Sequence, residues 1–225
     1  MKRTKEDIIL SVSNRLFLQN GYQATTMRKI AQEAGVSLGL ATYFFKNKRH
    51  IAVRILQTYL KDLRCRVSEA VDIVQQPLLH SATMVRICDV FFMSPDYRAF
   101  FLDCLLYDIY MESMEQMGTN AYESIMNKYH ISENPDLVLL SDNYIPPSIE
   151  RVLILEKEKG NFPGISLEEI PEIVFSASVA RYNDREEIRE AIQKAIVQSR
   201  EIVPHILAGI PSAREYSGQL FPAAH

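Results

Sequence analysis

Apolar residues near the start of the chain recur at helical spacing. Between Lys5 and Gln19, the side chains of Ile9, Val12 and Leu16 follow at intervals of three and four residues, which is the period of an amphipathic helix. Asn20-Gly21 is expected to end this helix, because both residues tolerate the left-handed conformation that follows helix C-termini. The pattern therefore predicts a first helix over about 5–19.

Two shorter helices are predicted directly afterwards. Thr26 is a good N-cap for a second helix, and Ser37 is one for a third helix over about 38–45. Gly35 lies between them and supplies a turn residue that accepts a positive φ. Two short helices joined by a three-residue turn form a helix-turn-helix, a motif that places its second helix in the DNA major groove.

The rest of the chain is also predicted to be helical. Asn47 caps a long helix over 48–74, and a very apolar stretch over 78–118 indicates buried helices. Prolines and Asp/Asn residues predict an irregular segment over 131–148, followed by a helix over 149–159. Capping boxes at Ser166/Glu169 and Asp184/Glu187 predict two final helices, which end near Tyr182 and Leu207.

These elements predict an all-α protein with two domains. A helix-turn-helix domain occupies 1–47, a larger helical ligand-binding and dimerisation domain occupies 48–210, and 211–225 is expected to be a flexible tail.

Charge is unevenly distributed and strengthens the DNA-binding interpretation. Residues 1–50 hold nine Lys and Arg against three Asp and Glu, a balance of +6, so the remainder carries −9 because the whole chain carries −3. A basic head on an acidic body is the charge layout of a DNA-binding module attached to a second domain.

Other bulk features limit the alternatives. The cysteines (Cys65, Cys88 and Cys104) match no disulfide framework or zinc pattern, and the five histidines show no pair at ligand spacing. We expect no metal and no cofactor. No apolar run approaches the roughly 18 residues of a membrane span, and the N-terminus lacks the apolar core of a signal peptide, so no membrane association and a cytoplasmic location are expected.

The segment 15–51, RLFLQNGYQATTMRKIAQEAGVSLGLATYFFKNKRHI, resembles the tetracycline-repressor (TetR) family of bacterial transcriptional regulators. The resemblance rests on the Gly-Tyr after the first helix, Thr-Thr before the second, the Ala-Gly-Val-Ser turn and the Tyr-x-Phe-x-x-Lys close. It implies a repressor that binds a palindromic double-stranded DNA operator as a homodimer and is released by an unknown small, largely apolar or cationic effector.

Candidate DNA-binding residues lie on and around the second and third helices. We expect Thr26, Arg28, Ser37, Leu38, Gly39, Thr42, Tyr43, Lys46 and Lys48 to contact DNA. Leu38 suits a thymine methyl, whereas the hydroxyls of Thr42 and Tyr43 suit phosphate oxygens. The third helix has no Arg, Asn or Gln for bidentate base contact, so Arg28 is a candidate for base or phosphate contact.

The last two helices are the candidates for dimerisation, which the resemblance implies. These helices carry an apolar stripe flanked by small residues. The expected interface residues are Ser176, Ala180, Ile188, Ile192, Ala195, Ile196, Ser199 and Val203. The alternative is that the stripe belongs to the core of one chain.

The resemblance also implies an effector pocket in the body. Candidate residues are Cys88, Phe92, Phe101, Cys104, Asp108, Met111 and Met114, because aromatic and methionine side chains form adaptable apolar walls. Asp108, like Asp89 and Asp103, lies in an apolar stretch, and a buried carboxylate favours a cationic ligand. The alternative is an ordinary core with its aspartates in water.

The sequence has two alternative interpretations of its function. An enzyme is disfavoured because the chain has no Gly-rich phosphate loop, nucleophile elbow or HExxH motif. The second alternative is a helical small-molecule or partner-binding protein whose head no longer binds DNA. Loss of affinity at high salt distinguishes the two, because phosphate contacts release counterions.

Overall fold

The computed structural model describes residues 4–115, 121–182 and 184–221. Among these residues, all regular secondary structure is helical, and turns and loops connect the helices. The helices form two compact units. Unit 1 contains 1–59, 92–113 and 210–225, and unit 2 contains 60–91 and 114–209. This division differs from the predicted boundary at residue 47, because the start of α4 and two later segments join the N-terminal helices.

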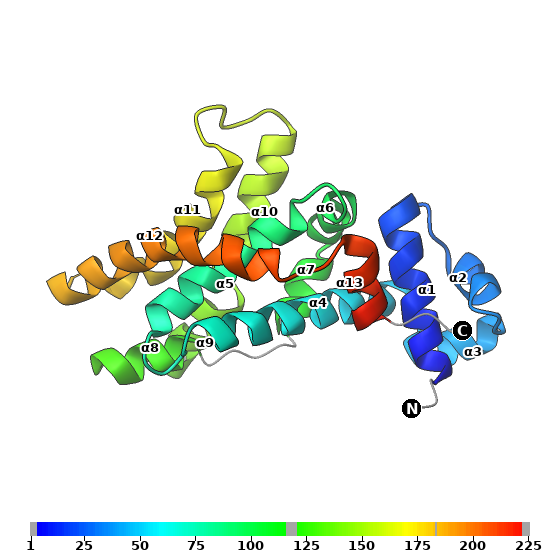
Figure 1. The fold of residues 1–225 in the computed structure, drawn as a ribbon, viewed down its shortest axis with the longest axis horizontal. Coiled ribbons are helices and arrows are strands. Elements are labelled where there is room, and N and C mark those ends of the chain that lie inside the picture. Colours follow the sequence, from blue (N-terminus) through cyan, green and yellow to red (C-terminus); the bar gives the residue numbers. More distant parts are fainter. Residues whose placement is uncertain (1–3, 116–120, 183, 222–225) are drawn as a thin grey trace. The chain divides into compact units, whose positions relative to one another are not determined.

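Unit 1 is built around the N-terminal helices (Figure 1). The helices that belong to it wholly or in part are α1 (Lys5–Asn20), α2 (Met27–Glu33), α3 (Leu38–Phe45), α4 (Lys48–Ala70), α6 (Arg98–Leu106), α7 (Ile109–Glu115) and α13 (Ala213–Leu220). Their core includes Phe17, Ile30 and Phe100, which are almost completely buried. Phe17 and Phe100 stack with their ring centroids 5.5 Å apart, which joins α1 to α6.

The C-terminal segment is ordered as helix α13, so the prediction of a flexible tail is wrong for 213–220. Tyr216 is completely buried, and the Ser217 hydroxyl lies 2.9 Å from the Tyr59 hydroxyl. Tyr59 also donates a hydrogen bond of 3.1 Å to Asn14 Oδ1 on α1. Figure 1 shows α13 in red beside α1 in blue. A single buried aromatic residue on a short polar helix gave no periodic signal in the sequence.

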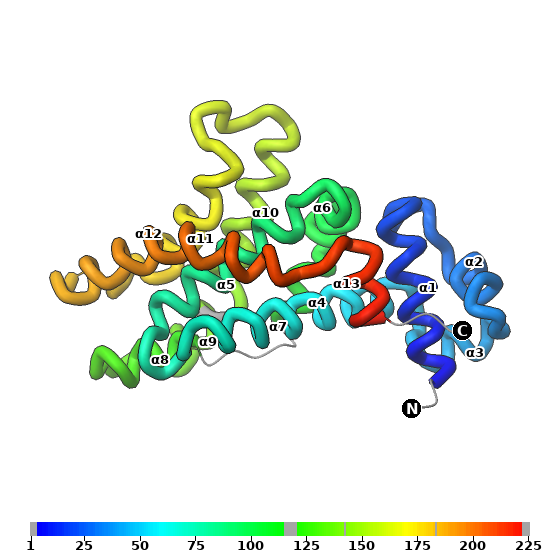
Figure 2. The backbone as a smooth tube through the Cα atoms, in the orientation of Figure 1, coloured from blue at the N-terminus to red at the C-terminus, as the bar shows by residue number. Residues whose placement is uncertain are grey.

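Unit 2 contains the remaining helices. These are α5 (Pro77–Phe92, whose last residue lies in unit 1), α8 (Ala121–Tyr129), α9 (Pro135–Asn143), α10 (Ile145–Glu158), η1 (Leu167–Glu169), α11 (Ile170–Val179), η2 (Ala180–Tyr182) and α12 (Glu186–Ala208). Figure 2 shows α10 and α11 as antiparallel neighbours joined by a loop. Their core extends to α8 and α12 through Ile125, Phe175 and Ile192.

The segment 131–148 is mostly helical, which corrects the prediction of irregular structure. Asn134 caps α9 through its side chain, which accepts a hydrogen bond from Asp136 N at 2.9 Å, and Pro135 occupies the first turn. Pro146 and Pro147 occupy the first turn of α10. Proline is tolerated there because first-turn N–H groups have no partner within the helix. These prolines start helices, although their clustering suggested a loop.

Of the other predicted helix ends, one is confirmed and two are wrong. Ser166 and Glu169 form the predicted capping box, with Ser166 N donating to the Glu169 carboxylate at 2.7 Å. The box predicted at Asp184 and Glu187 is wrong, because α12 begins at Glu186 with Arg185 as its N-cap. The long helix α4 ends at Ala70, four residues before the predicted end.

Candidate DNA-binding site

The turn between α2 and α3 is built by local capping, as the sequence predicted. Thr26 Oγ1 accepts a hydrogen bond of 3.2 Å from Lys29 N, and Ser37 Oγ accepts one of 3.1 Å from Leu40 N. Gly35 adopts φ +62°, a conformation that favours glycine. The two helices therefore have a fixed connection, which confirms the predicted helix-turn-helix in its local geometry.

One side of α2 and α3 is open to solvent. Of the nine predicted DNA-binding residues, Thr26, Arg28, Ser37, Leu38, Gly39, Tyr43 and Lys46 are exposed, whereas Thr42 and Lys48 are half-buried. The side chains of Leu38 and Tyr43 are 43% and 80% exposed, which is unusual for large apolar side chains on a helix. We call the exposed residues Arg28, Leu38, Tyr43 and Lys46 the contact face.

The cations of the head fall into two groups. The Arg28 and Lys46 side chains make no ion pair or hydrogen bond within the described residues, so their charges are available to an anion. Arg15, by contrast, pairs with Glu33 at 2.5 Å, and this hydrogen bond lowers the pKa of the Glu33 carboxyl. The positive charge that remains is therefore concentrated on fewer residues than the sequence count suggested.

Lys48 is half-buried, and its ammonium is hydrogen-bonded inside the chain; its predicted phosphate contact stays a prediction. Its ammonium donates hydrogen bonds to the backbone oxygens of Tyr22 at 2.8 Å, Gln23 at 3.3 Å and Thr25 at 3.1 Å. It also lies 4.1 Å from the centroid of the Tyr22 ring. An ammonium has three donors, and all three are used. Lys48 therefore fastens the connection between α1 and α2 to the start of α4.

Thr42 is also turned toward its own helix. Its hydroxyl lies 3.0 Å from the carbonyl oxygens of Leu38 and of Gly39, and it donates to these groups. A phosphate oxygen accepts hydrogen bonds, so a hydroxyl whose proton is already donated offers it little. The Thr42 hydroxyl is therefore hydrogen-bonded within its own helix, and its predicted phosphate contact stays a prediction. The DNA contacts of the other predicted residues stay predictions.

Sequence reasoning missed two residues that brace this region. Asp103 Oδ2 on α6 accepts a hydrogen bond of 3.0 Å from Tyr22 N, in the connection between α1 and α2. Arg49 pairs with Glu112 at 2.6 Å, and its guanidinium also donates to the backbone oxygens of Tyr107 and Asp108. These contacts join residues 58 to 81 positions apart, and no local pattern in the sequence marks them.

The predicted effector residues are divided between the units. Phe92, Phe101, Cys104, Asp108 and Met111 belong to unit 1, and Cys88 and Met114 belong to unit 2. The structure brings Phe92 and Phe101 together, with stacked rings 4.9 Å apart. Burial raises the pKa of both the Cys88 and the Cys104 thiol, which keeps them protonated. Their roles in binding an effector stay predictions.

Asp108 is not buried, although its place in an apolar stretch of the sequence suggested a buried carboxylate. It is exposed and lies between α6 and α7 with φ +55°, outside both helices. The carboxylate with the expected burial is instead that of Asp89 on α5, which is 4% exposed. The sequence places several aspartates among apolar residues, but whether an aspartate is buried depends on its position in the folded chain.

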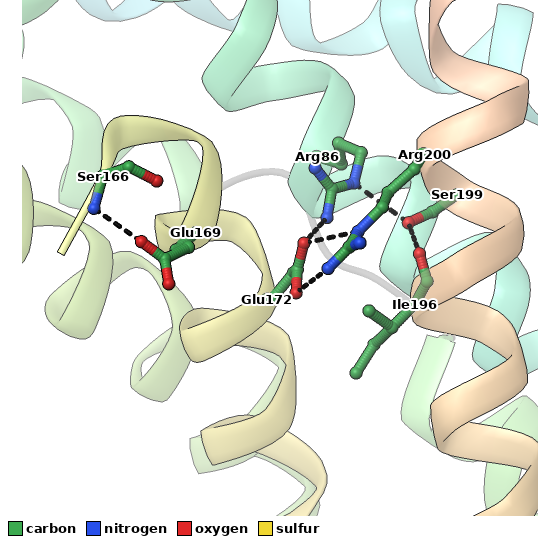
Figure 3. Close-up of polar contacts among 7 residues, drawn as sticks. All are labelled: Arg86, Ser166, Glu169, Glu172, Ile196, Ser199 and Arg200. Atoms are coloured by element: carbon green, nitrogen blue, oxygen red, sulfur yellow. Dashed lines mark hydrogen bonds and ion pairs between the residues drawn. The ribbon is translucent and has the colours of Figure 1, made fainter.

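The apolar stripe of α12 is core and is not a free face. Ile188, Ile192, Ala195, Ile196, Ser199 and Val203 are all buried within the single chain. The interpretation of these six side chains as an interface is therefore corrected, because their stripe packs in unit 2. Figure 3 shows Ser199 turned inward, where its hydroxyl accepts from Arg86 Nε at 3.1 Å and donates to Ile196 O at 2.7 Å. Ser176 is half-buried and Ala180 is exposed, and their place in an interface stays a prediction.

No group of three or more His, Cys, Asp or Glu is placed to hold a metal ion in the part of the chain that the structure describes. Among the same residues, no helix combines the length and the apolar character that crossing a membrane requires.

The geometry of α2 and α3 defines a helix-turn-helix, and comparison with known proteins finds similarity over the same region. Residues 9–55 match the family model described as bacterial regulatory proteins, tetR family. Residues 9–55 are therefore similar to the N-terminal region of tetR-family regulatory proteins. It covers α2, α3, most of α1 and the start of α4, and it does not extend into the body.

Two curated relatives match about a third of the chain. The chain is 36% identical over 72 residues to the HTH-type transcriptional regulator YhgD of Bacillus subtilis, a match that covers 32% of this chain and 38% of that protein. It is 31% identical over 75 residues to the HTH-type transcriptional repressor KstR2 of Mycolicibacterium smegmatis, over 33% and 37% of the two chains. Each match thus spans less than two fifths of the relative.

A solved structure is also similar over more of the chain. It is that of SmeT, the repressor of the Stenotrophomonas maltophilia multidrug efflux pump SmeDEF. The TM-score is 0.48 and the identity 17%, over 80% of this chain and 90% of that one.

Proposed function

We propose that the protein is a ligand-responsive transcriptional repressor that binds a palindromic double-stranded DNA operator. The observation that carries the proposal is the contact face. Within the described part of the chain, its Arg28 and Lys46 side chains have no partner, and Leu38 and Tyr43 are exposed. Unpaired cations suit phosphates, and an apolar side chain on the second helix of the motif suits base edges in the major groove. The tetR-family match over 9–55 supports the same function.

The proposed assembly is a homodimer, because a palindromic site pairs with a two-fold symmetric protein. With the α12 stripe buried, the surface left for a second copy is the outer side of α11 and α12. Ala177, Ala180 and Val197 are exposed there, and Val197 is 53% exposed. Small residues on α11 permit close approach of a second chain. We also propose that the protein is cytoplasmic and that it acts by binding DNA and effector, without catalysing a reaction.

Release from DNA is proposed to follow the binding of a small apolar or cationic effector. An effector shifts the equilibrium only if it binds the DNA-incompetent state more tightly than the competent one. Repressors occur among the relatives, since KstR2 and SmeT both carry that description.

The proposal is tested by selecting bound fragments from random double-stranded DNA with the purified protein at about 50 and about 200 mM salt. The expected result is a palindrome with half-sites about one helical turn apart, whose recovery falls steeply at the higher salt. The double variant Arg28→Ala, Lys46→Ala is expected to recover no site. Lys194→Ala, at an exposed position of α12, is the control and should recover the wild-type site.

Failure to enrich a site at either salt, with a folded protein, would contradict the proposal. It would favour the alternative of a helical binding protein whose head no longer contacts DNA, which the absence of Arg, Asn and Gln from α3 also suggests.

A further inference from the structure

The connection between α1 and α2 is held from both sides at a single residue, Tyr22. Its N–H donates a hydrogen bond of 3.0 Å to Asp103 Oδ2 on α6, and its backbone oxygen accepts one of 2.8 Å from Lys48 Nζ on α4. The two partners lie 81 and 26 positions away along the chain, and all three residues belong to unit 1. We call Asp103, Tyr22 and Lys48 the clamp.

The Tyr22 N–H needs an acceptor from outside α1. The helix ends at Gly21, whose own N–H makes the last bond to Phe17 O at 3.0 Å and whose φ of +81° turns the chain away. Tyr22 is 7% exposed, and a buried backbone N–H without a partner is costly. The Asp103 carboxylate supplies the partner and lies against Gly21, where a Cβ would meet Oδ2 at 3.6 Å.

The hydrogen bond to Asp103 fixes the connection more sharply than the apolar contacts beside it. The ring of Tyr22 lies 5.4 Å from that of Phe17 and 5.8 Å from that of Tyr107, between centroids. Apolar contacts are non-directional and tolerate small shifts. A hydrogen bond weakens steeply as its angle departs from linear, so the Asp103 carboxylate determines where Tyr22 sits on α6.

Both partners of Tyr22 are presented by helices that are joined to each other. Arg49 on α4 pairs with Glu112 on α7 at 2.6 Å and donates to Asp108 O, between α6 and α7, at 3.0 Å. Burial lowers the pKa of Lys48, and the Asp103 charge opposes that shift. The carboxylate therefore bonds one end of Tyr22 and favours the charged ammonium that bonds the other.

The clamped residue leads directly into α2. Thr25 is buried, its hydroxyl donates to Gly21 O at 2.9 Å, and its N–H donates to Tyr22 O at 3.3 Å. Thr26 follows as the N-cap of α2, and the turn at Gly35 joins α2 to α3. The position of the contact face relative to α4 and α6, all within unit 1, therefore depends on the clamp.

We propose that Asp103 is a positioning residue for DNA binding: through the Tyr22 N–H it holds α2 and α3 in the position that binds the operator. It contacts no DNA itself, and opening its bond to Tyr22 lowers operator affinity. The role in affinity rests on the proposed repressor function, whereas the clamp in the free protein does not.

The direction of the effect separates positioning from electrostatics. DNA phosphates repel a carboxylate, so removing one from the head would by itself tighten binding. Opening the clamp weakens binding instead, because apparent affinity falls with the fraction of the protein in the competent position. Weaker binding by a variant that has lost a negative charge therefore indicates positioning.

Amide hydrogen exchange of the full-length protein without DNA, followed by NMR, tests the clamp itself. The Tyr22 amide should be protected in the wild type. Asp103→Ala should speed its exchange at least about tenfold, the order expected for loss of a hydrogen bond to a charged group. The amides of Ile30 and Phe101, which bond within their own helices, are the references and should change by less than about threefold.

Fluorescence anisotropy with the selected operator tests the role in DNA binding. Asp103→Ala should weaken binding at least about threefold, with the salt slope and base preference of the wild type, because no DNA contact is lost. Asp96→Ala removes the same charge at an exposed position and should bind as tightly as the wild type or more tightly. Asp103→Asn keeps an acceptor oxygen and should fall between the wild type and Asp103→Ala in both measurements. Circular dichroism establishes that each variant is folded.

The outcomes separate the clamp from its role. An unprotected Tyr22 amide in the wild type overturns the clamp, as does exchange that Asp103→Ala leaves unchanged or an Asp103→Asn protein that exchanges as fast as Asp103→Ala. A smaller loss of affinity, tighter binding or a changed salt slope in Asp103→Ala overturns the positioning role. A wild type that selects no DNA contradicts the proposed function, and Tyr22 exchange still decides the clamp.

Discussion

The contact face of the head differs from the residues that brace it, although both contain cations and tyrosines. On the contact face, Arg28 and Lys46 have no partner among the residues that the structure describes, and Tyr43 is 80% exposed. We call Lys48, Arg49, Asp103 and Tyr216 the bracing residues. Among them, Lys48 donates to three backbone oxygens, and Tyr216 is completely buried. The difference teaches that residue type and position in a motif do not decide function, because a cation whose donors are used acts as a structural bond. Each prediction below substitutes a residue on one side of this division.

The largest expected effect is on stability and comes from α13. Tyr216→Ala removes a completely buried aromatic side chain and should lower the free energy of unfolding by about 3–5 kcal/mol. Tyr43→Ala is the matched substitution on the contact face and should change it by less than about 0.5 kcal/mol. Urea denaturation measures both. Equal losses would show that the exposure of the two tyrosines does not distinguish them.

The next effect concerns Lys48. Lys48→Met keeps the aliphatic length but removes hydrogen bonds to Tyr22, Gln23 and Thr25, and it should lower the free energy of unfolding by about 1.5–3 kcal/mol. The same denaturation experiment checks this. Lys46→Met, at an exposed position, is the control and should be within about 0.5 kcal/mol of the wild type. If Lys48→Met were as stable as the wild type, Lys48 would not be one of the bracing residues.

Arg28 tests what the contact face recognises. If Arg28 contacts a base, Arg28→Ala should weaken binding to the selected operator by about 1–3 kcal/mol and relax preference at one position of each half-site. Binding to a set of single-base operator variants measures both quantities. An equal loss on every sequence would instead make Arg28 a phosphate contact.

The smallest effect is expected at Thr42. Because its hydroxyl donates to Leu38 O and Gly39 O, Thr42→Val should leave operator affinity within about 0.5 kcal/mol of the wild type. Fluorescence anisotropy at fixed salt measures the affinity. A loss of about tenfold would return the Thr42 hydroxyl to the list of DNA contacts.

Local chemistry made the head predictable. The caps at Thr26, Ser37 and Asn47 and the turn at Gly35 each act within a few residues, so the sequence alone indicates them. The contacts of Lys48, by contrast, reach back 23 to 26 residues. No pattern in a single sequence shows which of several nearby cations such a contact uses.

The helices after the head were less predictable, because their pattern of apolar residues, prolines and aspartates is compatible with more than one structure. The apolar stripe of α12 fits a dimer interface or a core equally well, and only packing decides between them. The prolines in the first turns of α9 and α10 fit a loop or a helix start. Asp89, Asp103 and Asp108 all follow apolar residues, yet their environments differ from buried to exposed.

The most direct test of the account is the salt dependence of binding to the selected operator for the wild type, Lys46→Ala and Lys48→Ala. Neutralising one phosphate contact reduces the slope of log K against log salt by about one. We predict this reduction for Lys46→Ala. For Lys48→Ala we predict a slope equal to that of the wild type, measured under conditions in which the variant is folded. A reduced slope for Lys48→Ala with an unchanged slope for Lys46→Ala would contradict the division between the contact face and the bracing residues.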